Sequence, residues 1–345
     1  MSVNLEQAKK LIIKVIRAGL VPMVTSSPGM GKSSIAMEIA NEFNLEYLDE
    51  RLSYKDPVDL GGMIYVDQEA KIKKATYLPF DNFPIEGDPL PKGKDGWLLN
   101  LDEFNSAPPS VMAAAYKLVL DKCVGNHKLH KNVAIMACGN LLTDNAIVEE
   151  MGTAMQSRLV HIQVHSDLDV WMKWAVPAKI DSKAIGYLAW QPQNLNAFDP
   201  EHTDLTFPCE RTWEMLSKLI KNEDTSDPLM MDLLAGTIGK GTALEFIAYS
   251  EVYSTLPTFK EILANPMGTS IPVEPSTMFA LSSMLMEYIG KYKDTADIIS
   301  IMQYVKRVPI DFQVLIFKHA VQNFTNILKV ASINSWSFSL SKHLI

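Results

Sequence analysis

One short stretch constrains the fold of this chain more than any other: residues 21–34, which read VPMVTSSPGMGKSS. A short, mostly apolar run leads into a glycine-rich turn, and apolar residues then recur at helical spacing at Ile35, Ile39 and Phe43. A strand, a tight glycine turn and a helix start together cradle phosphate groups, because glycines let backbone N–H groups turn toward phosphate oxygens. The alternative is a chance glycine-rich turn before a helix, which this context disfavours.

Each position of the turn has an expected role in binding a nucleoside triphosphate. The stretch matches the pattern G-x-x-x-x-G-K-[ST] except at its first position, where Ser26 replaces glycine. Lys32 is expected to reach the β- and γ-phosphates, and the Ser33 hydroxyl to ligate Mg²⁺. Ser26 must either adopt a positive φ or give the turn another shape, so we expect binding to be weakened slightly at most. The residues predicted to surround the nucleotide are Ser27, Pro28, Gly29, Met30, Gly31, Lys32, Ser33 and Ser34.

Length and composition exclude several classes of protein. With 345 residues, 47% of them hydrophobic, the chain can bury a large core and form two or more domains. Its formal net charge of −8 argues against a surface devoted mainly to nucleic acid. The three scattered cysteines indicate a reducing compartment. No signal-peptide layout or transmembrane-length apolar run is present, which predicts a soluble, cytoplasmic protein without membrane insertion.

The order of secondary structure predicts two domains. Strands and helices alternate in the first part, which predicts a parallel sheet with helices on both faces. From Asp167 onward the segments read as helices only. We therefore expect an α/β nucleotide-binding domain over residues 1–166 and a helical lid with a C-terminal helical extension over 167–345. The expected strands are 21–24, 45–48, 97–101, 133–137 and 159–164, with loops at 56–62 and 78–96 and a hairpin at 125–131. The expected helices are 5–18, 111–120, 146–157, 169–175, 211–221, 230–253, 276–292 and 296–305.

A second chemical signal follows the expected strand at residues 97–101. That apolar run delivers two consecutive carboxylates, Asp102 and Glu103, at its carboxyl end. An Asp-Glu pair after a single strand is a weak signal, but downstream of a phosphate-binding turn it is typical of a Walker B motif. Asp102 is then expected to hold Mg²⁺ through water, and Glu103 to orient and polarise the attacking water. Together the two motifs predict hydrolysis of ATP.

The residues around this pair carry a family resemblance. Residues 101–121, LDEFNSAPPSVMAAAYKLVLD, resemble the Walker B region of the MoxR branch of AAA+ ATPases, in which a pattern like DEINRAPP precedes a helix. Residues 59–62 are similar to the segment that leads into this branch's insertion, and the likeness is greatest to versions found in phages and prophages. Asn105 keeps the family's residue, whereas Ser106 stands where the branch commonly has arginine. The resemblance covers residues 5 to about 253.

The resemblance also implies roles for three residues outside the two motifs. Asn140, after the fourth strand, corresponds to a polar sensor that helps to place the attacking water; otherwise it is a solvated amide. Arg158, before the fifth strand, corresponds to an arginine finger that reaches the neighbouring subunit's nucleotide; otherwise it forms a surface salt bridge. Arg211, at a helix start, corresponds to a second sensor in the lid. His161 and His165 lack metal-site spacing and are expected to be structural.

Two functions follow from this resemblance. The first is a ring-forming ATPase, hexameric as in the family, that remodels or activates a protein client in the manner of a chaperone. Such proteins often act beside a von Willebrand A domain protein, which would be a separate chain because the D-x-S-x-S metal motif is absent here. The second is an AAA+ motor or loader acting on DNA. The acidic charge and the lack of a basic helix favour the first.

Overall fold

The computed structural model describes residues 2–66, 74–144, 148–221, 223–225, 227–291 and 295–323. The chain forms two compact units. The first comprises Met1–Val170 and Phe198–His202, and the second Trp171–Ala197 and Thr203–Ile345.

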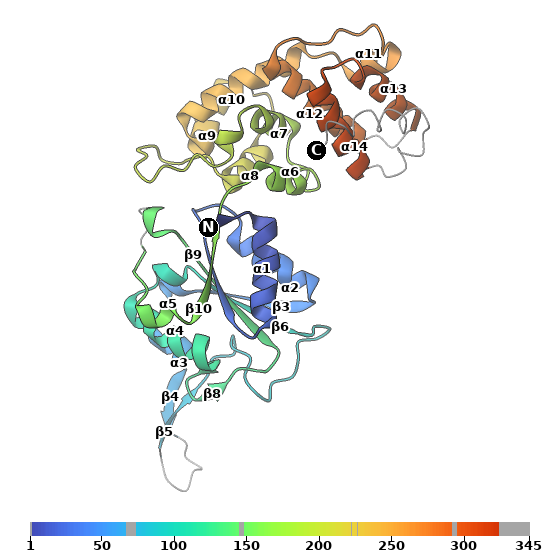
Figure 1. The fold of residues 1–345 in the computed structure, drawn as a ribbon. Helices are drawn as coiled ribbons and strands as arrows, with labels where there is room; N and C mark the ends of the chain where they lie inside the picture. Colours follow the sequence, from blue (N-terminus) through green and yellow to red (C-terminus); the bar gives the residue numbers. More distant parts are fainter. Residues whose placement is uncertain are drawn as a thin grey trace. The chain divides into compact units, whose positions relative to one another are not determined.

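A six-stranded parallel sheet forms the centre of the first unit (Figure 1). Its strand order is β1-β10-β2-β9-β6-β3, so β9 lies between the strand that precedes the glycine turn and the strand that precedes the two carboxylates. All neighbouring strands are parallel, and the carboxyl ends of β2, β9 and β6 therefore share one edge of the sheet. The strands are β1 Ser2–Val3, β2 Val21–Thr25, β3 Leu45–Arg51, β6 Gly96–Asp102, β9 Val133–Gly139 and β10 Leu159–Val164.

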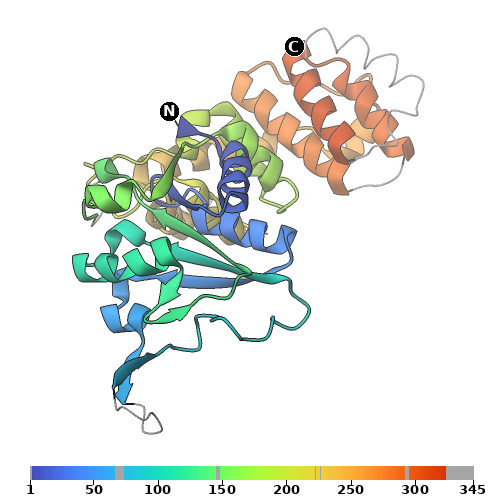
Figure 2. The same cartoon turned by 60° about the horizontal axis from the view of Figure 1, so that its bottom comes forward.

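Helices cover both faces of this sheet, as Figures 1 and 2 show. The central strands read as continuous apolar runs because they are buried on both sides, and every residue of β6 is buried. Alternate residues enter separate cores: Leu98 packs with residues of α1 (Leu5–Arg17) and α2 (Lys32–Glu42), and Leu99 with residues of α3 (Pro57–Gly61) and α4 (Pro109–Asp121). The predicted fold class, a parallel P-loop α/β core followed by a helical region, is confirmed.

Two small hairpins extend the first unit. The predicted hairpin at 125–131 is present but begins earlier, with β7 Cys123–Val124 and β8 His127–Lys128. A second hairpin, β4 Met63–Val66 with β5 Ala75–Leu78, was not predicted. The expected loop at 56–62 is wrong, because Asp56 and Asp59 form a capping box that starts helix α3.

Two expected helices differ from the structure for identifiable reasons. The helix expected at 146–157 is wrong: 145–147 lie outside the described residues, 148–152 are not helical, and α5 spans only Thr153–Gln156. A tertiary contact competes with helix formation there, since the Glu149 N–H donates to the Asn105 carbonyl at 2.7 Å. The single helix expected at 230–253 is two helices, α9 Pro228–Ile238 and α10 Lys240–Val252. Gly239 between them has a φ of 81°, which ends one helix before the next begins.

The regular secondary structure of the second unit consists of helices in the residues that the structure describes, as expected from residue 167 onward. Trp213, Tyr187 and Phe246 form its aromatic centre, with ring centroids 5.4–5.9 Å apart. Residues 324–345 of the predicted helical lid and C-terminal extension lie outside the described residues. Within the described ranges, no helix is both long and apolar enough to cross a membrane. The remaining helices are α6 Leu168–Ala175, α7 Ser182–Trp190, α8 Glu210–Leu219, α11 Phe259–Ala264, α12 Pro275–Lys291, α13 Thr295–Val305 and α14 Ile310–Asn323.

Candidate functional site

The glycine-rich turn joins the carboxyl end of β2 to the first residue of α2. Gly29 and Gly31 have φ values of 79° and 80°, in the left-handed region that favours glycine. Ser26 is fully buried and is not among the residues with positive φ. The turn therefore has a different shape from one with glycine at this position, and the Ser26 backbone is not strained. Beneath the turn, buried Met30 packs into the core shared with α1 and α2.

The ammonium group of Lys32 folds into the turn. Its Nζ donates to the Ser26 carbonyl at 2.9 Å, the Ser26 hydroxyl at 3.0 Å and the Ser27 carbonyl at 3.2 Å. The side-chain oxygen of Asn140 accepts from the same ammonium at 3.1 Å. At least four acceptors therefore share the three N–H groups of Lys32. A phosphate oxygen that binds this lysine must replace at least one of them.

Ser33 and Asp102 meet directly beside the turn. The Ser33 hydroxyl donates to Asp102 Oδ2 at 2.7 Å, and the other carboxylate oxygen of Asp102 accepts the Glu103 N–H at 2.8 Å. A hydroxyl and a carboxylate are the hard oxygen ligands that Mg²⁺ prefers. No cluster of three or more His, Cys, Asp or Glu side chains suited to a metal occurs in the described ranges. The residues fit Mg²⁺ held by one carboxylate, one hydroxyl and the phosphates of a bound nucleotide.

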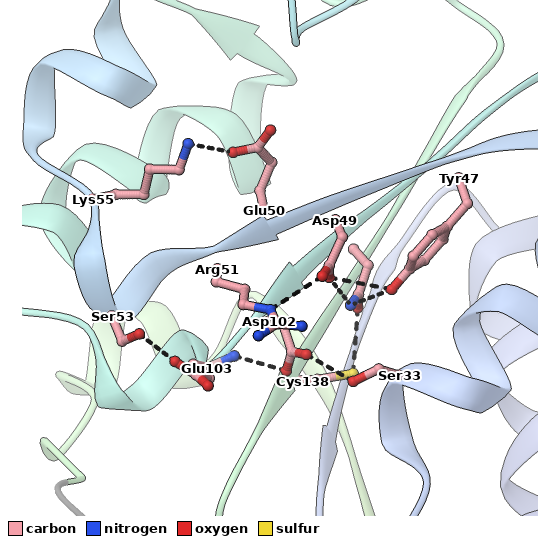
Figure 3. A network of polar contacts seen from close by, with 11 residues as sticks. Ser33, Tyr47, Asp49, Glu50, Arg51, Ser53, Lys55, Asp102, Glu103 and Cys138 are labelled. Atoms are coloured by element: carbon pink, nitrogen blue, oxygen red, sulfur yellow. Dashed lines mark hydrogen bonds and ion pairs between the residues drawn. The ribbon is translucent and has the colours of Figure 1, made fainter.

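Glu103 has an unusual backbone and a side-chain partner that the sequence did not reveal. Its φ of 53° and ψ of 35° are left-handed, which is uncommon for a residue with a Cβ. The Ser53 hydroxyl donates to Glu103 Oε2 (Figure 3). Ser53 lies in the short helical turn η1 (Leu52–Tyr54), which directly follows β3. Ser53 reaches Glu103 because β3 neighbours β6 in the sheet, so only the strand order, and not the spacing of residues in the sequence, predicts this contact.

A second polar network lies on the α2 face of the sheet next to Asp102 (Figure 3). Arg51 is the register partner of Asp102, and its Nε contacts Asp49 Oδ2 at 3.2 Å. This contact raises the pKa of the Arg51 guanidinium, and the charges of Asp102 and Glu103 add to the rise. A permanent positive charge therefore stands at the edge of the carboxylate pair.

A buried side chain in turn holds the carboxylate of Asp49 by a hydrogen bond. Buried Asn100 donates to the Tyr47 hydroxyl at 3.0 Å and to Asp49 Oδ1 at 3.2 Å. Burial raises the pKa of Tyr47 and the nearby Asp49 carboxylate raises it further, so the phenol stays neutral. These contacts fix the side chain that orients Arg51.

Asn140 stands between the turn and the carboxylates because β9 lies between β2 and β6. Its backbone N–H donates to Asn105 Oδ1 at 3.1 Å, and its carbonyl accepts from Asn105 Nδ2 at 2.8 Å. Sequence reasoning assigned Asn105 no role. It also missed Asp144, a buried carboxylate that lies 3.4 Å from the Ser27 hydroxyl.

Arg158 lies near the amino ends of the strands, at the end of the sheet opposite the glycine turn. It precedes β10, whose first residue Leu159 pairs with Val21, whereas the glycine turn follows Thr25 at the other end of β2. Arg158 precedes Leu159 by one residue, so five steps of ~3.3 Å place roughly 17 Å between Arg158 and the level of Thr25, more than an arginine side chain spans. The guanidinium lies over the Tyr116 ring at 5.6 Å and donates to the Ala154 carbonyl.

Two further sequence predictions concern residues outside this cluster. Arg211 is an exposed residue in the first turn of α8, in the second unit, so its role as a second sensor stays a prediction. His161 contacts the Gln156 carbonyl at 3.0 Å, and His165 the Ser2 hydroxyl at 3.1 Å. The predicted residues that the structure brings together are Lys32, Ser33, Asp102, Glu103 and Asn140.

Comparison with known proteins gives little beyond the fold. No family model matches the chain, and no curated protein matches it. Among solved structures, it is similar to a mutant form of RuvB from Thermotoga maritima, at 13% identity and a TM-score of 0.41, covering 81% of this chain and 82% of that one. It is also similar to a candidate ATPase from Cytophaga hutchinsonii, at 11% identity and a TM-score of 0.37, covering 98% of this chain and 88% of that one. Likenesses this distant carry no argument about function.

Proposed function

We propose that this chain is a Mg²⁺-dependent ATPase of the AAA+ type. The observation that carries the proposal is the 2.7 Å contact between Ser33 and Asp102. It joins the end of the glycine turn to the end of β6, so the two groups expected to bind Mg²⁺ converge from motifs 69 residues apart in the chain. Lys32, the residue before Ser33, contacts Asn140, and the Glu103 N–H donates to the same Asp102 carboxylate.

Each residue then has a role in in-line attack of water on the γ-phosphate. Backbone N–H groups of the turn and the Lys32 ammonium bind the phosphates. Ser33 and Asp102 would hold Mg²⁺, which would neutralise charge on the phosphate oxygens. Glu103 orients and polarises the attacking water, and the Asn140 amide helps to place it.

We propose further that the active form is a ring, hexameric as the family resemblance implies. Arg158 is the residue that supports this proposal. It directly precedes β10, whose first residue Leu159 pairs with Val21, at the end of the sheet opposite the glycine turn, so a nucleotide bound to the same subunit is out of its reach. An arginine acting on the adjacent subunit's γ-phosphate would complete the site in trans. Domains 1–166 and 167–345 would then act as core and lid, with Arg211 as the lid's sensor of the γ-phosphate.

The work of this ATPase is proposed to be remodelling or activation of a protein client. The support is the likeness of residues 101–121 to the MoxR branch and the net charge of −8, which disfavours a DNA surface. A separate von Willebrand A domain protein is the expected kind of partner. ATPase rates measured with duplex DNA and with such a protein decide between the classes: stimulation by DNA alone refutes the chaperone proposal in favour of a DNA motor.

The Lys32→Ala variant tests the site itself. Removing this ammonium is expected to abolish binding of ATP·Mg²⁺ in calorimetry and phosphate release in a coupled assay. Lys10→Ala is a matched control, because Lys10 is an exposed lysine on α1 that pairs with Glu6. Nucleotide affinity of Lys32→Ala within a few-fold of wild type would refute the proposed phosphate-binding role.

A further inference from the structure

We propose that Asn105 is a positioning residue whose buried amide clamps Asn140 to the turn that carries Glu103, and that turnover depends on this clamp. The inference rests on the proposed ATPase function, in which Asn105 had no assigned role. Asn105 lies in the short helical turn η2 (Phe104–Ser106), directly after Glu103, and only 3% of it is exposed.

The clamp consists of two reciprocal hydrogen bonds. Asn105 Oδ1 accepts the Asn140 N–H at 3.1 Å, and Asn105 Nδ2 donates to the Asn140 carbonyl at 2.8 Å. Only an amide supplies an acceptor and a donor side by side in this way, so the pairing also fixes the orientation of the amide. The last register pair between β6 and β9 is Leu101 with Ala137, and the Asn105 side chain therefore continues the pairing of these strands beyond their ends.

Gly139 provides the space for this amide. A Cβ built at Gly139 would lie 2.1 Å from Asn105 Oδ1 and 2.7 Å from Met23 Cε. Gly139 is not among the residues with positive φ, so its backbone conformation is open to any residue. The close approach of the Asn105 amide is the contact that demands glycine at this position.

The clamp connects two groups expected to act on the same water. On one side it fixes the Asn140 peptide, whose side-chain oxygen lies 3.1 Å from Lys32 Nζ. On the other side it anchors the turn after Glu103, whose left-handed backbone is unfavourable for a residue with a Cβ. The Asn105 carbonyl holds a third segment by accepting the Glu149 N–H at 2.7 Å. Without the amide, Asn140 and Glu103 would be positioned independently of each other.

This arrangement predicts that loss of the Asn105 amide lowers the rate of catalysis without weakening nucleotide binding. The contacts of Lys32 with the turn and of Ser33 with Asp102 do not pass through Asn105. Outer partners that orient functional groups typically contribute roughly 10- to 100-fold to activity. We therefore expect Asn105→Ala to lower kcat roughly 10- to 100-fold and to leave the Kd for ATP·Mg²⁺ within about three-fold of wild type.

Asn132→Ala is the matched control. Asn132 directly precedes β9, and its Nδ2 donates to the Asp95 carbonyl just before β6 at 2.8 Å. It therefore bridges β6 and β9 at their amino ends, at the end of the sheet opposite Asn105. Both variants are expected to unfold at lower temperature than wild type, but only Asn105→Ala is expected to lose turnover. Wild-type kcat in Asn105→Ala, or an equal loss of kcat in both variants, would overturn the proposal.

A double-mutant cycle with Gly139→Ala tests the contact itself. Gly139→Ala alone should displace the amide and reproduce the kcat loss of Asn105→Ala. In the double variant the added methyl group enters space vacated by the amide, beside the flexible end of Met23, so the two losses should not multiply. Losses that multiply in full would overturn the clamp. A wild-type chain without ATPase activity would instead refute the proposed function, and with it any role of the clamp in turnover.

Discussion

Ser26, the residue that departs from the phosphate-binding pattern, is predicted to weaken nucleotide binding by competing for Lys32. Its hydroxyl accepts from the Lys32 ammonium at 3.0 Å and donates to the Ser27 carbonyl at 3.0 Å. Bound phosphates would claim two of the three N–H groups of Lys32, so at least two of the acceptors that now contact this ammonium must be released. Ser26→Ala removes one competitor before binding takes place.

The size of the effect follows from the sharing of these hydrogen bonds. A hydrogen bond to a charged group contributes about 1.5–3 kcal/mol, but at least four acceptors share three donors here, and the other acceptors can take up the freed N–H. The net gain in binding free energy should therefore be smaller, about 0.5–1.4 kcal/mol, which is a roughly two- to ten-fold lower Kd. Lys32 is partly exposed, which favours the lower end.

Calorimetric titration of ATP·Mg²⁺ into wild type, Ser26→Ala and Ser26→Gly measures this directly. Because Ser26 has no positive φ, glycine gives the turn no conformational advantage, and both variants should bind more tightly by the same factor. Tighter binding by Ser26→Gly alone would show that the shape of the turn matters and not the hydroxyl. Weaker binding by both variants would refute the reasoning, since the hydroxyl would then orient Lys32 toward the phosphates.

Three further predictions concern other parts of the molecule. Ser53→Ala should change the ATPase rate at least about three-fold without changing the Kd for ATP, because it removes the hydroxyl partner of Glu103; an unchanged rate contradicts a role for this contact. Arg158→Ala should bind ATP but not hydrolyse it, and mixing it with Lys32→Ala over several ratios should restore activity; mixed rings that stay inactive at every ratio argue against action in trans. Burial raises the pKa of Asp181, so its charged form costs stability above that pKa. Asp181→Asn, which can still cap α7, should raise Tm at pH 7 but not near pH 3, and an equal rise at both would contradict this assignment.

The sequence was sufficient where chemistry and secondary structure coincide in one segment. Lys32 and Ser33 follow a strand in a recognisable turn, and Asp102 and Glu103 end another strand. Parallel strands bring such ends to one edge, so the cluster could be predicted without knowing the strand order. The strand order places Asn140 between them. Hydrophobic periodicity does not reveal that order, so the role of Asn140 was predicted from the family resemblance.

The features that the sequence missed depend on tertiary neighbours. Ser53 acts on Glu103 only because β3 lies beside β6, and Asn105 bonds to Asn140 only because β9 ends next to η2. The same contact network explains the error at 146–157, where the bond from Glu149 to Asn105 replaces the expected helix. At 230–253 the apolar pattern runs through both helices, and the positive φ of Gly239 separates them.

Comparison of ATP binding and ATP turnover in Glu103→Gln tests the central claim most directly. Glutamine keeps the size of the side chain and can still contact Ser53, but it cannot polarise water as a carboxylate does. We expect calorimetry to give a Kd for ATP·Mg²⁺ within about three-fold of wild type while single-turnover phosphate release falls at least roughly 100-fold. Phosphate release at the wild-type rate would contradict the account, because the catalytic carboxylate would then lie elsewhere.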